Sequence, residues 1–95
     1  MGIIGRLFGK KTFDPNAHRR SLLATGRITD GVILECDING AGEEVVIYAY
    51  TLNGVDFESS DVLTFEQKQM PAKYAPGARV GIRYDPKNQG NSIVE

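Results

Sequence analysis

Several residue types that build common functional sites are scarce in this 95-residue sequence. Cys36 is the one cysteine, so an internal disulfide is excluded, which fits a reducing compartment. His18 is the one histidine, and together the two residues do not supply the ligands of a metal site. No apolar run approaches the roughly 18 residues that span a bilayer, and the N-terminus lacks the apolar core of about 7–15 residues of a secretory signal. We therefore expect one cytoplasmic domain without a metal or cofactor.

The near-neutral net charge of −1 conceals two oppositely charged parts. Residues 1–27 hold six basic residues against Asp14 alone, a net charge of +5. Residues 28–95 hold five basic against eleven acidic residues, a net charge of −6. Such a split predicts a basic segment with its own partner, attached to an acidic body. The alternative is that the basic segment docks on that body.

The first 13 residues combine apolar and basic side chains at helical spacing. On a helix the apolar residues share one face and the basic residues lie beside or opposite it: Ile3, Ile4, Leu7 and Phe8 are apolar, and Arg6, Lys10 and Lys11 are basic. Three glycines in the same segment each disfavour a helix by up to about 1 kcal/mol relative to alanine. We expect this segment to gain order only by burying its apolar face, and its seven named residues are the candidate contacts with a membrane or a partner.

Periodicity divides the rest of the chain into one helix and five strands. Pro15 suits a first helical position and Gly26 a C-terminal cap, which predicts a short helix over residues 15–24 within a segment of residues 14–26. The strands are predicted over residues 27–37, 43–52, 55–63, 78–84 and 91–94, with a bulge or bend at Gly31.

Asn53-Gly54 predicts a two-residue hairpin loop, because both residues tolerate positive φ. Such a loop pairs Leu52 with Val55 and Tyr50 with Phe57. Alternate residues of the two strands then share a core face: Val46, Tyr48, Tyr50, Leu52, Val55 and Phe57. We expect these aromatic residues, with Tyr74 and Tyr84, to fill the core. A nucleic-acid stacking platform would need a basic groove, which the acidic body does not offer.

Two turns complete the fold prediction. Thr64 and Gln67 have the spacing of a capping box, so a short helical segment precedes the fourth strand. Pro76-Gly77 suits a type II turn immediately before that strand. Five antiparallel strands of this size avoid exposed edges by curling into a barrel. We therefore predict a mainly β protein in which residues 27–95 form a small five-stranded antiparallel barrel. An OB-like barrel is favoured, with an SH3-like barrel as the alternative, and a short helix lies N-terminal to it.

Three parts of the sequence carry a family pattern: Ala24-Thr25-Gly26, residues 46–57, and residues 74–94 with the ending Y-x-P-G-x-x-V-x-I-x-Y-D-P. This pattern resembles a bacterial domain-of-unknown-function family of short all-β modules, often found beside transmembrane helices. The resemblance covers residues 24–95 and implies an all-β domain without catalytic residues to carry over. In this chain the basic, apolar N-terminal segment stands in place of a spanning helix.

Neither of the two scarce residues indicates a reactive site. Cys36 alternates with Val32 and Leu34, which predicts a buried cysteine that behaves as a small hydrophobe. His18 falls in the predicted helix beside Arg19 and Arg20, and the sequence pattern indicates no catalytic arrangement that includes it.

No group of acid, base and nucleophile can be identified, so the sequence does not predict an enzyme. We expect a non-enzymatic interaction module whose N-terminal segment holds it at an anionic membrane surface or on a membrane protein, peripheral to the inner membrane. The alternative is a soluble protein-binding or self-associating barrel that forms a homo-oligomer through the same segment. An oligonucleotide-binding OB-like domain is less favoured, because phosphates would be repelled by the acidic body.

Overall fold

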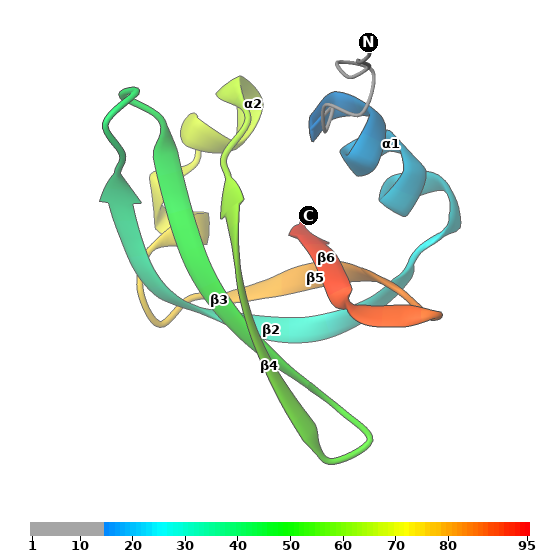
Figure 1. Cartoon of the computed structure of the whole chain (residues 1–95). Coiled ribbons are helices and arrows are strands. Elements are labelled where there is room, and N and C mark those ends of the chain that lie inside the picture. The colour runs from blue at the N-terminus through cyan, green and yellow to red at the C-terminus, as the bar shows by residue number, and fades with distance from the viewer. Residues whose placement is uncertain (1–14) are drawn as a thin grey trace, which may run out of the picture.

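The computed structural model describes residues 15–95, and it begins with a helix that leads into a β-sheet (Figure 1). The helices are α1 (Pro15–Thr25), α2 (Phe65–Lys68) and a 3₁₀ turn at Pro71–Tyr74. The strands are β2 (Arg27–Ile38), β3 (Glu44–Leu52), β4 (Val55–Val62), β5 (Arg79–Asp85) and β6 (Asn88–Val94).

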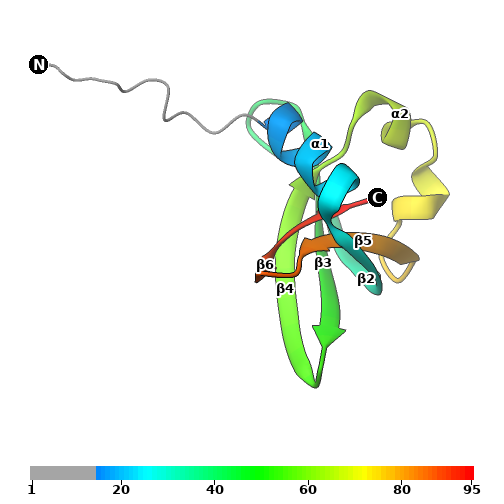
Figure 2. The ribbon, with the colours of Figure 1, turned by 90° about the vertical axis from the view of Figure 1, so that its right-hand side faces the viewer.

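All strand pairs are antiparallel, and the order across the sheet is β4-β3-β2-β5-β6. The sheet curls until its two outer strands, β4 and β6, come into contact. The structure therefore confirms a mainly β fold with a five-stranded, nearly closed barrel and one short helix N-terminal to the strands. In two perpendicular views, α1 and α2 lie at one end of the barrel and the β3–β4 hairpin projects from the other (Figures 1 and 2).

The β3–β4 hairpin has the predicted loop and register. Asn53 and Gly54 adopt φ values of 52° and 81°, and Leu52 pairs with Val55 as expected. The prediction that Val55 belongs to the core is wrong, because its side chain is 54% exposed. The hairpin tip extends past the end of the barrel, so no other strand covers it.

The core lies inside the curled sheet and contains the predicted tyrosines. Its buried members are Ile33, Val46, Tyr48, Tyr50, Leu52, Leu63, Tyr74, Val80, Ile82 and Val94, with Phe57 and Tyr84 packed partly against them. Tyr50 stacks on Phe57 at a centroid distance of 5.2 Å, and its hydroxyl donates to the Gln89 carbonyl at 2.6 Å. The aromatic residues therefore fill the barrel, and the Tyr50 and Tyr74 hydroxyls donate to partly buried backbone carbonyls.

The irregularity of β2 lies further along the strand than predicted. The register with β3 shifts between Ile33 and Glu35, which leaves Leu34 as the extra residue of a bulge. Gly31 pairs regularly, so the predicted bulge there is wrong. A Cβ atom at Gly31 would stand 2.5 Å from Cγ1 of Ile82, so glycine is required for close packing against β5.

The short helix α2 has the predicted capping box and is tied to the last strand. The Thr64 hydroxyl accepts from the Gln67 N–H at 3.1 Å, and the Gln67 side chain accepts from the Thr64 N–H at 2.8 Å. The buried Gln67 amide also donates to the Val94 carbonyl at 3.0 Å. Within residues 15–95, no helix has the length and apolar character needed to cross a membrane.

Candidate functional site

The seam between β4 and β6 is where the barrel is left open. These strands are the two edges of the sheet, and within residues 15–95 no backbone hydrogen bond joins them. Unpaired strand edges are available to other polar groups or to another chain. In this structure side chains bridge part of the seam.

Asp61 is the main bridge across the seam. One carboxylate oxygen, Oδ2, accepts from the Val94 N–H of β6 at 3.0 Å, and Oδ1 accepts from the Val62 N–H of β4 at 2.9 Å. Arg19 of α1 lies beside this bridge: its Nη1 donates to the Val94 carbonyl at 3.1 Å and lies 3.7 Å from Asp61 Oδ2. The Asp61 carboxylate therefore accepts hydrogen bonds from both edge strands, and the Arg19 guanidinium connects α1 to β6 and to Asp61.

The electrostatics of Asp61 follow from its position. Burial raises the pKa of this carboxyl, whereas the Val94 and Val62 N–H groups and the charge of Arg19 lower it less. The fold thus holds the ionised form at a net energetic disadvantage. Groups with such shifts are frequent at functional sites, although structural networks also produce them.

A cleft of about 490 Å³ opens along the seam. Its walls are His18 and Arg19 of α1, residues 60–62 of β4, and Ser92 and Ile93 of β6. A volume of this size falls in the usual range of about 300–1,000 Å³ for a ligand site.

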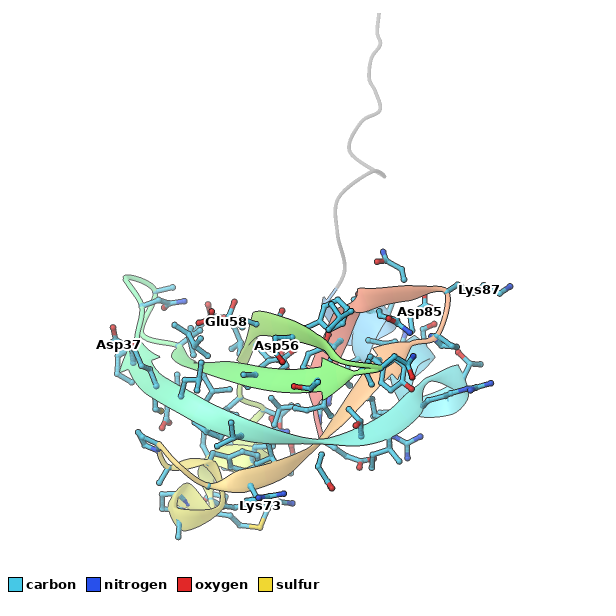
Figure 3. The ribbon with its side chains drawn as sticks, turned by 90° about the horizontal axis from the view of Figure 1, so that it is seen from below. Asp37, Asp56, Glu58, Lys73, Asp85 and Lys87 are labelled. Atoms are coloured by element: carbon cyan, nitrogen blue, oxygen red, sulfur yellow. The ribbon has the colours of Figure 1, made fainter. Side chains whose placement is uncertain are left out.

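The outer side of β4 is acidic. Asp56 and Glu58 are exposed and project from β4 on one side of the sheet, whereas Lys73 lies on the opposite side (Figure 3). Glu43 adds another carboxylate at the cleft, and β4 contains no basic residue. This edge therefore presents negative charge along its length.

A buried polar pair lies inside the barrel beside the seam. The Tyr48 hydroxyl and Ser92 Oγ are 2.8 Å apart and both side chains are buried. Burial raises the pKa of Tyr48 to about 12. The phenol therefore stays protonated at neutral pH, so it acts as a hydrogen-bonding core group and not as a base.

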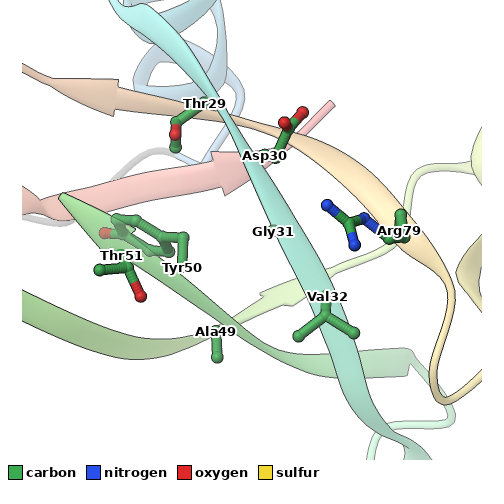
Figure 4. A pocket seen from close by; sticks show the side chains of 8 residues that line it. All are labelled: Thr29, Asp30, Gly31, Val32, Ala49, Tyr50, Thr51 and Arg79. Atoms are coloured by element: carbon green, nitrogen blue, oxygen red, sulfur yellow. The ribbon is translucent and has the colours of Figure 1, made fainter.

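A second hollow of about 350 Å³ lies over Gly31, where β2 carries no side chain (Figure 4). Asp30, Thr51 and Arg79 around it are exposed. These side chains are ordinary outer-face residues of neighbouring strands. The hollow therefore gathers no catalytic group, and it is not the space of a missing Gly31 side chain, because Ile82 already fills that position.

The predicted contact residues 3, 4, 6, 7, 8, 10 and 11 lie outside the described residues. Cys36 is described, and the prediction that it is buried is wrong, since its side chain is exposed. Cys36 pairs with the buried Val46 and so lies on the inner face of the sheet, but this end of β2 extends beyond the barrel and the core does not cover it. Partial burial, then Glu44 and Asp37, raise the pKa of the Cys36 thiol, which disfavours the reactive thiolate.

His18 lies on α1 as expected, but it is half-buried at the cleft wall. Among the described residues, no cluster of three or more His, Cys, Asp or Glu side chains could hold a metal ion.

A family model described as "Domain of unknown function (DUF3592)" matches residues 24–95. The chain belongs to this family. The DUF3592 segment begins at the end of α1 and includes all five strands, so both edges of the seam fall within it. Arg19 and the basic N-terminal segment precede it. Neither a curated protein nor a solved structure matches the chain.

Sequence reasoning missed Asp61. The predicted register contained the signal, because alternation from Val55 and Phe57 places Asp61 on the inner face, opposite Val46. An inward-pointing charge on an edge strand is a recognised device for managing unpaired edges.

Proposed function

We propose that this DUF3592 protein is a non-enzymatic interaction module held at an anionic membrane surface by residues 1–13. The observation that carries the proposal is the composition of this segment, which combines four apolar residues at helical spacing with Arg6, Lys10 and Lys11 and contains no acid. The protein would then be peripheral to the cytoplasmic face of the inner membrane.

The magnitudes support attachment through this segment. Each basic residue near an anionic surface contributes about 1 kcal/mol, so three contribute about 3 kcal/mol, and burial of the apolar side chains adds to this. The rest of the protein, with a net charge of −6 over residues 28–95, is repelled by the same surface. Attachment is therefore confined to the N-terminal part, and the barrel remains free to contact a partner.

The polar groups of the described residues support a role without catalysis. Asp61 is engaged by two strand N–H groups and Arg19, and Tyr48 remains protonated. Tyr48 is paired with the Ser92 hydroxyl, but a protonated phenol does not act as a base toward it.

The test compares co-sedimentation of the full chain with vesicles of phosphatidylcholine alone and of phosphatidylcholine with phosphatidylserine. We expect binding to the anionic vesicles only. Reversing Lys10 and Lys11 to Glu should weaken it by at least about 30-fold, from about 2 kcal/mol for two lysines. The matched control reverses Lys68 and Lys73 of the body, which changes the net charge equally and should weaken binding much less.

Equal pelleting of the full chain and of a chain lacking residues 1–13 would rule the proposal out. If deletion instead abolishes a dimer in sedimentation and vesicle binding is absent, the self-associating barrel is the better account.

A further inference from the structure

We propose that the free edge of β4 binds an extended, basic peptide segment of a partner protein by strand addition. The inference concerns residues of the barrel and goes beyond membrane attachment, on which it does not depend.

No strand is paired with the outer edge of β4, although β6 contacts β4 at the seam. The Leu63 N–H donates to the Glu44 carbonyl of β3, whereas the Val62 N–H turns to the Asp61 side chain. Because backbone groups alternate along a strand, Ser60 and Glu58 direct their N–H and C=O groups away from β3, as Val62 does. Asp61 engages the edge only at Val62, so the positions before it are available to a new strand.

Apart from its acidic side chains, the inward-pointing Asp61 among them, the edge lacks the usual protections against pairing. Its register with β3 is regular from Val45/Val62 to Leu52/Val55, without a bulge. The β4 sequence VDFESSDV contains no proline and no lysine. The cleft of about 490 Å³ lies along its end at residues 60–62, which leaves space beside the strand.

Charge selects the occupant. Asp56 and Glu58 are exposed on the outer side of the edge, so a strand paired antiparallel with β4 would place alternate side chains about 5 Å from them. Lysine or arginine at those positions forms favourable cross-strand pairs. The intervening residues of the new strand turn toward Phe57 and the cleft, where apolar side chains fit.

The same charges disfavour a second copy of this chain. Pairing of two β4 edges would bring the acids of one strand against the acids of the other, and like charges directly opposite each other are destabilising. The acidic edge therefore works against self-association while it admits a basic strand.

The experiment titrates the ¹⁵N-labelled full chain with acetyl-Lys-Val-Lys-Val-Lys-Val-amide. The control peptide carries Glu in place of each Lys. We expect saturable chemical-shift changes and new hydrogen-exchange protection of the Glu58 and Ser60 amides with the lysine peptide only. A flat titration, or equal binding of both peptides, overturns the proposal.

A matched pair of variants locates the site. Glu58→Lys removes an acid from the edge and should weaken the lysine peptide about three- to tenfold, the effect of losing one cross-strand pair and adding a repulsion. Asp30→Lys makes the same charge change on β2 and should leave affinity unchanged. Equal effects of the two variants would show non-specific charge attraction and overturn the proposal.

Ser60→Pro provides a second check. It removes an outward N–H without removing a bond to β3, so the sheet should persist and peptide binding should be lost. If the Glu58 and Ser60 amides are already protected from hydrogen exchange before any peptide is added, the edge is not free for a partner protein and the proposal is contradicted. If that protection falls on dilution, the occupant is a second copy, and if it is independent of concentration, it is another segment of the same chain.

Discussion

Replacing Asp61 with alanine should destabilise the barrel at its seam. The carboxylate accepts from the N–H groups of Val94 and Val62, at 3.0 and 2.9 Å, and it lies beside Arg19. Alanine provides no acceptor at this position. The Val94 N–H bond is partly buried, so its loss leaves a donor that water does not fully satisfy.

The expected loss is about 1–3 kcal/mol, the usual effect of leaving one buried donor without its partner. The pair with Arg19, at 3.7 Å and partly exposed, adds less than about 1 kcal/mol. The buried carboxylate also has an unfavourable desolvation energy, which raises its pKa, and replacing it with alanine removes that cost. This gain offsets part of the loss, so the net destabilisation stays within about 1–3 kcal/mol. Against a total of about 5–15 kcal/mol for a domain, this is a readily measured change.

Urea unfolding at neutral pH, followed by far-ultraviolet circular dichroism, measures the effect through the midpoint and slope. The matched control is Glu58→Ala, which removes an exposed acid from the same strand and should change stability by less than about 0.5 kcal/mol. The Val94 amide should also exchange faster in Asp61→Ala. If the two variants have the same midpoint, Asp61 does not hold the seam and the reasoning is refuted.

Three other predictions concern acid titration, packing and thiol reactivity. The pKa of Asp61 is raised above 3.8 in the fold, so the native state binds more protons at this carboxyl than the unfolded chain does. The free energy of unfolding of the wild-type chain, relative to that of Asp61→Asn, should therefore fall as pH rises from 3.8 through the folded pKa. If urea melts show this difference rising instead, burial is not the cause of the shift. Gly31→Ala should cost about 1–3 kcal/mol by overpacking, whereas Gly40→Ala, with open space around its Cβ, should be nearly neutral, and equal urea midpoints would argue against the close approach. Cys36 should react with iodoacetamide at about pH 8 more slowly than free cysteine and faster after Glu44→Gln, and a rate that ignores Glu44 would contradict the assigned electrostatics.

The parts of the fold that depend on local chemistry were predictable from the sequence. Asn53-Gly54 fixed the hairpin register, because a two-residue loop with positive φ admits one pairing of the flanking strands. Thr64 and Gln67 gave the capping box for the same reason, since their interaction spans one helical turn. In both cases the decisive contacts join residues close in sequence.

The parts that depend on distant contacts were not predictable. Alternation alone does not tell which face of β2 is buried, and the predicted face with Val32, Leu34 and Cys36 was the wrong one, because Ile33 is the buried residue. The bulge at Leu34 then returns Cys36 to the inner face, opposite Val46, at a position that the barrel no longer covers. The bridge from Asp61 to Val94 joins strands that are far apart in the chain and needs the curvature of the whole sheet. The acidic residues of β4 are visible in the sequence. That they lie on an unpaired edge follows only from the strand order, which places β4 at one side of the sheet.

Amide hydrogen exchange along β4 tests most directly whether the barrel ends in a free strand edge. The structure predicts an alternating pattern in the unliganded chain: slow exchange at Phe57 and Ser59, whose N–H groups point to β3, and fast exchange at Glu58 and Ser60, whose N–H groups point away. Equal protection of all four amides would contradict the account, because it would mean that β4 already has a partner on both sides.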